Sequence, residues 1–220
     1  IMAELSQDKA MIEAFQSGVD IHRMTAAEVF GIAAEDVTEE MRSRAKALNF
    51  GVLYGMGAAG FAKSAGISFD EAREFIENYF VRFPKVQDYM EKTKELARRQ
   101  GYAQTLLGRR RYLPEINSST PQLRAAAERM AINHPIQGSS ADIIKMAMVK
   151  IAEEISSEPD QWRMLLQIHD ELLFEAADGM IMKRAPHIRD IMEQVYKLNA
   201  PIRVEIKAGR NWNDGEKLLL

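Results

Sequence analysis

Apolar residues recur every three or four positions through most of the first hundred residues, which is typical of helices that bury one face. The pattern predicts helices over 2–16, 20–31, about 38–54 and 85–100, and a helix, a glycine turn and a second helix between 61 and 84. Thr38 followed by two glutamates is typical of a helix start. The glycine-rich run after Tyr54 and the proline at Pro84 are expected to end their helices.

The second half adds strands to this helical pattern. "GYAQTLLGRRRYLP" predicts a hairpin with Gly108 in its turn, and two helices over 120–134 and 137–155 are expected to join at Pro135. In "RMLLQIHDELLFEA", residues 163–176, two short apolar runs predict two buried strands. A helix over 180–198 and a strand over 201–209 complete the chain. Helices first and strands late predict an α+β fold.

Composition sets limits on the chemistry. The 220 residues are 46% hydrophobic, enough for one large domain or two small ones, and the net charge of −3 by itself indicates no polyanionic partner. The chain has no cysteine, which excludes disulfides and cysteine-ligated metals. No apolar run approaches a membrane span and no signal peptide is visible, so a cytoplasmic protein without membrane contact is expected. Because it opens at Ile1 inside an apolar segment, we expect a piece of a longer chain.

His169, Asp170 and Glu171 separate the two apolar runs. If the runs form a hairpin, these residues occupy its tight turn, where buried strands would anchor carboxylates with exposed tips. Carboxylate oxygens suit a hard cation such as Mg²⁺. The alternative is an ordinary polar turn.

Arg42, Lys46, Phe50 and Tyr54 recur every four residues in "MRSRAKALNFGVLYG". On a helix each step of four drifts by only about 40°, so the four side chains share one inclined stripe. Two cations and two aromatic rings could bind a triphosphate and stack on a base or sugar. The alternative is an amphipathic helix whose aromatic rings pack in the core.

Two further groups of polar residues also have both a functional and a purely structural interpretation. Between positions 92 and 111 there are seven cationic residues and one glutamate. This excess of positive charge indicates contact with a phosphate backbone. The alternative is a charged surface that faces solvent. In "ERMAINHPIQG", Arg129, Asn133 and Gln137 stand four apart and could hydrogen-bond to bases or sugars. Capping and packing are the alternative roles. Pro135 argues against an uninterrupted helical stripe.

Together these motifs resemble family A DNA polymerases, the bacterial DNA polymerase I type. The similarity runs through "DIHRMTAAEVFG", "RSRAKALNFGVLYG", "TLLGRRRYLP", "RMAINHPIQG", "QIHDELLFE" and the closing "GRNWND". The resemblance implies a helical fingers subdomain and a palm with a small antiparallel sheet. It divides the chain into palm at 1–12, fingers at 13–116 and palm again at 117–220.

The resemblance also implies roles for single residues. Incoming deoxynucleoside triphosphates would be bound by five residues: His22, Arg42, Lys46, Phe50 and Tyr54. Primer–template DNA would be contacted by Arg129, Asn133, Gln137 and His169. Asp170 and Glu171 would be catalytic carboxylates that bind metal, with two Mg²⁺ ions about 4 Å apart and Mn²⁺ as a substitute.

One part of the family pattern is missing from these 220 residues. The family carries a strand like "DYSQIELR" just before the position of Ile1, with the first catalytic Asp and the Glu that excludes ribonucleotides. Asp8 and Asp20 follow that position and do not match it. We therefore expect an N-terminal polymerase portion, carrying the thumb and the first catalytic Asp, to act with this chain.

The implied function is DNA-templated DNA polymerisation by two-metal nucleotidyl transfer, in a bacterial or phage-like cytoplasm, with the isolated chain inactive. Two alternatives stay open. One is a catalytically inactive nucleic-acid-binding fragment, and the other is a related single-subunit RNA polymerase or reverse transcriptase. The presence of "NFGVLYG" argues against both.

Overall fold

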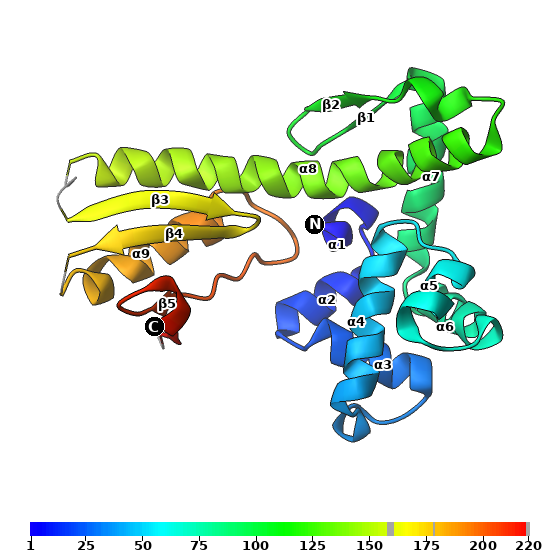
Figure 1. The fold of residues 1–220 in the computed structure, drawn as a ribbon, viewed down its shortest axis with the longest axis horizontal. Helices are drawn as coiled ribbons and strands as arrows, with labels where there is room; N and C mark the ends of the chain where they lie inside the picture. Colours follow the sequence, from blue (N-terminus) through cyan, green and yellow to red (C-terminus); the bar gives the residue numbers. More distant parts are fainter. Residues whose placement is uncertain (158–160, 178, 219–220) are drawn as a thin grey trace. The chain divides into compact units, whose positions relative to one another are not determined.

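The computed structural model describes residues 1–157, 161–177 and 179–218. The chain forms two compact units, Ile1–Ser139 and Ser140–Leu220, and each is described by itself. Helices dominate the first unit, whereas a strand hairpin opens the part of the second unit that follows the long helix α8 (Figure 1). The α+β prediction is therefore confirmed.

The first unit opens with two short helices instead of the one predicted over 2–16. They are α1 (Met2–Ser6) and α2 (Lys9–Ser17). Gln7 between them has a φ of 55°, and the carboxylate of Asp8 accepts a hydrogen bond from the Met11 amide. The prediction of a single helix was wrong because a buried aspartate caps a new helix in the middle of the apolar pattern.

Helices α3 (Ile21–Phe30) and α4 (Glu39–Leu53) pack together, joined through the short 3₁₀ helix η1 (Ala34–Asp36). Buried Ala26, Val37 and Ala45 form the core between them. The Thr38 hydroxyl accepts from the Met41 amide at 3.2 Å, as the predicted N-cap requires. Helix α4 ends at the residue before Tyr54, as expected.

The next three helices lie close to the predicted ranges, although α5 begins at Ala58 instead of 61 and α7 at Pro84 instead of 85. Helices α5 (Ala58–Ala65) and α6 (Phe69–Arg82) are separated by Gly66, which has a φ of 65°. Ser68 and Glu71 form a capping box that starts α6. Pro84 stands at the first position of α7 (Pro84–Gln100), where its missing N–H costs no hydrogen bond.

A hairpin and the first part of a long helix, which continues into the second unit, complete the first unit. Strands β1 (Tyr102–Gln104) and β2 (Arg110–Tyr112) pair antiparallel with Gly108 in the connection, as predicted. The 3₁₀ helix η2 (Pro114–Asn117) leads into α8 (Pro121–Ile155). The prediction of two helices joined at Pro135 was wrong, since α8 runs through the proline. Ile132 and Ser139 on either side are buried, and their packing holds the helix together across the proline.

In the second unit, β3 (Trp162–Ile168) and β4 (Glu171–Ala176) form the predicted antiparallel hairpin. Trp162 is buried and, with Ile151 and Ile188, lines the space between β3, α8 and helix α9 (Ile181–Gln194). The strands are less buried than expected, because Leu165 and Leu166 are exposed on the described two-stranded sheet.

The predicted strand over 201–209 is mostly absent from the described structure. Only β5 (Lys207–Ala208) pairs, with β6 (Glu216–Lys217), around the 3₁₀ helix η3 (Trp212–Asp214). The Val204 amide donates to the Glu193 carboxylate at 2.9 Å instead of to a neighbouring strand. The alternation of apolar residues over 201–209 does not reveal that the Glu193 side chain is the partner of the Val204 amide.

Candidate nucleotide, DNA and metal sites

Helix α4 carries the cationic and aromatic stripe. Arg42, Lys46 and Phe50 lie on the helix, and Tyr54 follows its last residue. The rings of Phe50 and Tyr54 are 43% and 41% exposed, so the interpretation that they pack in the core is wrong. The stripe is open to a ligand along its length.

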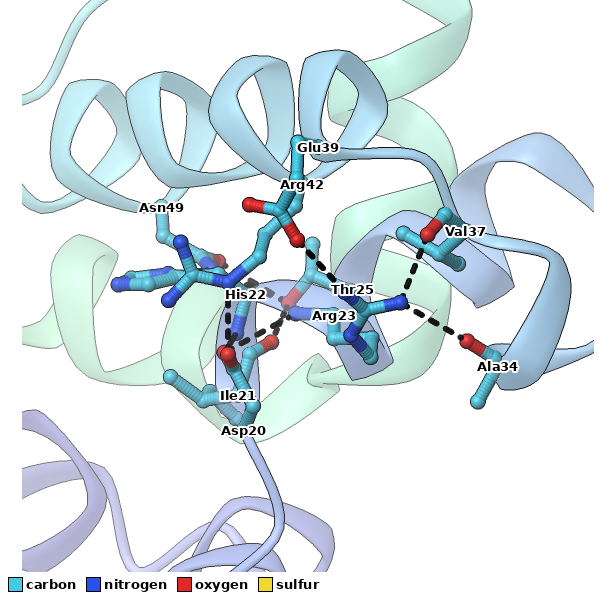
Figure 2. Close-up of polar contacts among 10 residues, drawn as sticks. All are labelled: Asp20, Ile21, His22, Arg23, Thr25, Ala34, Val37, Glu39, Arg42 and Asn49. Carbon is cyan, nitrogen blue, oxygen red and sulfur yellow. Dashed lines mark hydrogen bonds and ion pairs between the residues drawn. The ribbon is translucent and has the colours of Figure 1, made fainter.

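Asp20 holds Arg42 in place (Figure 2). Arg42 Nε donates to Asp20 Oδ2 at 2.7 Å, while Asp20 Oδ1 accepts from the amides of His22 and Arg23 at the start of α3. Partial burial of Asp20 opposes ionisation, but the hydrogen bonds from Arg42 and the two amides outweigh it. The pKa of this carboxyl therefore lies below its usual value.

The outer edge of the Arg42 guanidinium remains available. Its Nη1 and Nη2 atoms make no hydrogen bond with the residues that the structure describes. The pair presents a planar fork of donors, the geometry that binds phosphate oxygens. Asp20 thus orients Arg42 through Nε and leaves the fork facing outward from this contact.

His22 stands beside the same helix. Its ring centroid lies 5.9 Å from that of Phe50, and its Nδ1 lies 2.9 Å from Asn49 Nδ2. Burial lowers the pKa of His22. Asp20 opposes this shift, whereas Arg42 and Lys46 add to it. The structure therefore brings His22, Arg42 and Phe50 together as the motifs suggested.

Arg129, Asn133 and Gln137 share one continuous helix, so Pro135 does not interrupt their stripe. Arg129 lies against the loop after α4, because a Cβ on Gly55 would come within 3.2 Å of Arg129 Cγ. With Met56 and Ile132 it lines a cavity of about 710 Å³. Asn133 Oδ1 is buried without a hydrogen-bond partner in the described residues, and Gln137 is exposed.

The basic segment is partly neutralised inside the first unit. Arg98 pairs with Glu128 at 2.7 Å, and Lys94 pairs with Glu91. Arg110 lies over the ring of Tyr102 at 4.5 Å. The predicted excess of positive charge on this segment is therefore smaller than the sequence count indicates.

The turn between β3 and β4 presents the proposed metal ligands. His169 has a φ of 55°, and Ile168 pairs with Glu171 across the turn. His169, Asp170 and Glu171 are all exposed, as expected for the carboxylate tips. The prediction that all three occupy the turn was wrong, because Glu171 is the first residue of β4 and pairs with Ile168. Neither carboxylate forms an ion pair with another described residue.

The donor chemistry of this turn fits Mg²⁺ in part. Two carboxylates supply the hard oxygen ligands that the ion prefers. Among the described residues, however, no group of three or more metal-ligating side chains comes together. Asp170 and Glu171 could supply part of a coordination shell.

Asp20, Thr25 and Asn49 are site residues that the sequence reasoning missed. Asp20 had a detectable signal, since an aspartate directly before a helical pattern is typical of an N-cap. Thr25 and Asn49 gave none, because their contacts depend on how α3 packs against α4. Spacing within one helix does not reveal such contacts.

Residues 1–214 match the family described as DNA polymerase family A. The chain belongs to this family. The resemblance drawn from the motifs is thereby confirmed, and with it the expectation of a polymerase-like α+β fold.

Similar proteins include three named DNA polymerase I. The protein from Mycobacterium leprae is 49% identical over 96% of this chain and 23% of its own length. Those from Pseudomonas aeruginosa and Geobacillus stearothermophilus are each 45% identical, over 97% and 98% of this chain and 23% and 25% of their own lengths. This family A chain thus spans about a quarter of the length of these relatives.

A solved structure shows the same fold. It is described as the POL domain of Pol1 from M. smegmatis in complex with DNA primer-template and dNTP, and it is 46% identical to this chain. The match has a TM-score of 0.87 and covers 91% of this chain and 35% of that one. Separately, no helix in the described ranges is long and apolar enough to cross a membrane.

Proposed function

We propose that this chain supplies the fingers and most of the palm of a DNA-templated DNA polymerase, which adds deoxynucleotides to a primer 3′ end. The observation that carries the proposal is the exposed stripe on α4, whose Arg42 is held by Asp20 with its outer donors unpaired among the described residues. Family membership supports it, as does the similar solved structure, a complex with primer-template and dNTP. Both favour DNA polymerisation over the RNA polymerase and reverse transcriptase alternative.

In this proposal the fingers comprise 13–116, and the palm comprises 1–12 and 117–220. The Arg42 fork and the Lys46 ammonium bind phosphate oxygens of the incoming nucleotide, and His22 adds a third contact. Phe50 and Tyr54 pack on the sugar and the nascent base pair. These interactions align the α-phosphorus with the primer 3′-hydroxyl and neutralise charge that moves onto the leaving pyrophosphate.

The DNA would be held by a second set of residues. Arg129, Asn133 and Gln137 offer donors and acceptors along one helix, which suits the edges of bases and sugars in the minor groove. His169 would lie near the primer end. A further polymerase portion, with the thumb and the first catalytic Asp, would complete the enzyme.

Asp170 and Glu171 would hold Mg²⁺, or Mn²⁺ in its place, together with carboxylates from the rest of the enzyme. When bound, the two ions would lower the pKa of the primer hydroxyl and stabilise the pyrophosphate. This chain contributes Asp170 on a tight turn and Glu171 at the first residue of β4, and the pairing of β3 with β4 limits their movement.

The test compares Arg42→Ala with Arg44→Ala in an active polymerase that contains these 220 residues. Arg44 is the matched control, because it lies on the same helix and pairs with Glu40 at 2.7 Å. Arg42→Ala should raise KM for nucleotides and lower kcat while primer–template Kd stays near wild type, and Arg44→Ala should change little. If Arg42→Ala and Arg44→Ala change nucleotide KM and kcat by equally small amounts, the stripe on α4 does not bind the nucleotide.

The alternative of a nucleic-acid-binding fragment without catalysis is favoured by one observation. The described residues bring only Asp170 and Glu171 to the proposed metal site. Primer extension by these 220 residues joined to the proposed further polymerase portion separates the two, since a binding module would retain DNA affinity and show no extension.

A further inference from the structure

Two side chains, those of Thr25 and Asn49, link the interior of the first unit to His22. Thr25 Oγ1 donates to the Ile21 carbonyl at 2.7 Å, and Asn49 Nδ2 donates to Thr25 Oγ1 at 3.1 Å. Asn49 Nδ2 also lies 2.9 Å from His22 Nδ1. Figure 2 draws these contacts. Thr25 and Asn49 are 1% and 7% exposed, so solvent competes little for these bonds.

The positions of the protons follow from counting donors. A hydroxyl has one proton, and a carbonyl oxygen can only accept, so the Thr25 proton goes to Ile21 at the shorter distance. The Thr25 oxygen must then accept from Asn49, although Asn49 Oδ1 also lies 3.3 Å away. This requirement turns the NH₂ group of Asn49 toward Thr25, and its second N–H points to His22 Nδ1.

His22 is thereby left with one available tautomer. Burial lowers its pKa, with Asp20 opposing and with Arg42 and Lys46 adding to the shift, so the ring is neutral near neutral pH. A neutral imidazole whose Nδ1 accepts a hydrogen bond carries its proton on Nε2. Nε2 has no partner among the described residues, and the ring is only partly buried.

We propose that Thr25 and Asn49 are positioning residues that fix the tautomer of His22, so that Nε2 always presents an N–H to a phosphate oxygen of the incoming nucleotide. The other tautomer would present a lone pair and repel the anion. Because Nε2 also carries a proton in the imidazolium form, the donor is kept in both charge states. The proposal rests on the proposed function, in which His22 contacts the triphosphate.

The first measurement reads the tautomer directly. Nitrogen NMR of the His22 ring, in an active polymerase containing this chain and at a pH above the His22 pKa, should show Nε2 protonated and Nδ1 unprotonated. A proton on Nδ1 in the unaltered protein would overturn the proposal. This result does not depend on nucleotide binding, so it stands apart from the proposed function.

The second measurement compares two substitutions at Thr25. Thr25→Val keeps the shape but removes the hydroxyl that orients Asn49, so the ring should become a mixture of tautomers. Thr25→Ser keeps the hydroxyl and loses a methyl group, so the ring should keep its tautomer. We expect Thr25→Val to raise nucleotide KM by about three- to tenfold, and Thr25→Ser to leave it near wild type.

The relative effects of Thr25→Val and Thr25→Ser on nucleotide KM distinguish a hydrogen-bond relay from Thr25 to His22 from simple packing. If the serine variant, which leaves a cavity, impairs nucleotide use as much as the valine variant, packing alone explains Thr25 and the proposal is overturned. An altered tautomer with unchanged KM also overturns it. His22→Ala then identifies the failure: unchanged KM in that variant shows that the phosphate contact itself, and not the relay, was wrongly assigned.

Discussion

Asp20 is a residue with two structural roles, because one oxygen caps α3 and the other holds Arg42. Asp20→Asn keeps a good capping side chain and removes the charge. The Asp20–Arg42 pair is about one-third exposed on each side, so solvent screening limits its contribution, and we expect a loss of at most about 1 kcal/mol at neutral pH. Asp36→Asn, an exposed carboxylate outside this network, is the control.

The pH dependence of that loss has a defined direction. The folded pKa of Asp20 lies below its ordinary value of 3.8, so the stabilisation is present above that value and is lost as pH falls through the folded pKa. Denaturation of the Asp20→Asn variant and the parent should therefore give a difference at neutral pH that shrinks in acid. A constant difference would assign the loss to the cap instead of the charge.

Lys46 is exposed, and no ion pair joins it to another described residue. Its ammonium group is therefore available for the triphosphate. Lys46→Ala should weaken nucleotide use by about 1.5–3 kcal/mol, the range of one charge-assisted contact, and leave duplex binding near wild type. Lys63→Ala, another exposed lysine on a neighbouring helix, is the control. Weaker primer–template binding with unchanged nucleotide KM and kcat would indicate that Lys46 contacts the DNA instead of the nucleotide.

Phe50 is expected to lie beside the 3′ carbon of the incoming sugar, as the family resemblance implies. Phe50→Tyr adds a hydroxyl that can replace the missing 3′-OH of a dideoxynucleotide, so discrimination against that analogue should largely collapse. Because the ring is 43% exposed, the hydroxyl should find water and leave the melting temperature unchanged. Phe69→Tyr, at an exposed ring on α6, is the control. An unchanged ratio of kcat/KM for the two substrates would contradict the assignment.

The sequence and the resemblance pointed to the residues at this site that face outward, namely His22, Arg42, Lys46, Phe50 and Tyr54. Four of them form a recognisable pattern because two cations and two aromatic residues recur at a spacing of four in one segment. Asp20 accepts a hydrogen bond from Arg42, and Asn49 contacts both His22 and Thr25, so these three residues position the outward-facing ones through contacts between α3 and α4. Asp20 could have been found as a helix N-cap, whereas many polar residues could serve in place of Thr25 and Asn49, and no local pattern identifies those two.

Among the elements, α8 shows why the helix prediction failed at Pro135. A proline inside a helix removes one hydrogen bond and costs about 3 kcal/mol, which justified the predicted break. The compensation lies in the hairpin, where the Leu106 amide donates to Ser139 Oγ at 2.9 Å. His134 Nε2 also lies 3.2 Å from the Arg109 carbonyl. Contacts between elements held the helix together, and the helical pattern did not contain them.

Gly138 sits at this contact between α8 and the hairpin. A Cβ there would lie 2.5 Å from Thr105 Cγ2, too close for both groups to keep their positions. Gly138→Ala should therefore destabilise the protein by about 1–3 kcal/mol, despite the better helix propensity of alanine. Chemical denaturation measures the change, with Ser140→Ala at an exposed position of the same helix as control. A stabilised Gly138→Ala variant would show that the hairpin can move away at little cost.

At the scale of the whole molecule, helix number and order were largely predictable, whereas strand burial was not. Apolar runs predicted the hairpin of β3 and β4 correctly, because strand pairing between neighbours is local. They also predicted burial, yet Leu165 and Leu166 are exposed. Burial of a strand depends on what packs against its faces, and a run of apolar letters does not show whether the same chain supplies it.

As an isolated chain, the 220 residues carry only part of the proposed metal site. Asp170 lies in the turn after β3 and Glu171 is the next residue, at the start of β4, whereas bridging two ions about 4 Å apart takes carboxylates from more than one side. The chain spans 23% of the length of the Mycobacterium leprae relative. We therefore expect no template-directed extension with Mg²⁺ and primed DNA from the mass-verified chain alone. Activity should return when the 220 residues are tested within a longer polymerase, and that activity should vanish with Asp170→Ala. Sustained extension by the isolated chain would show that its own residues complete the metal site.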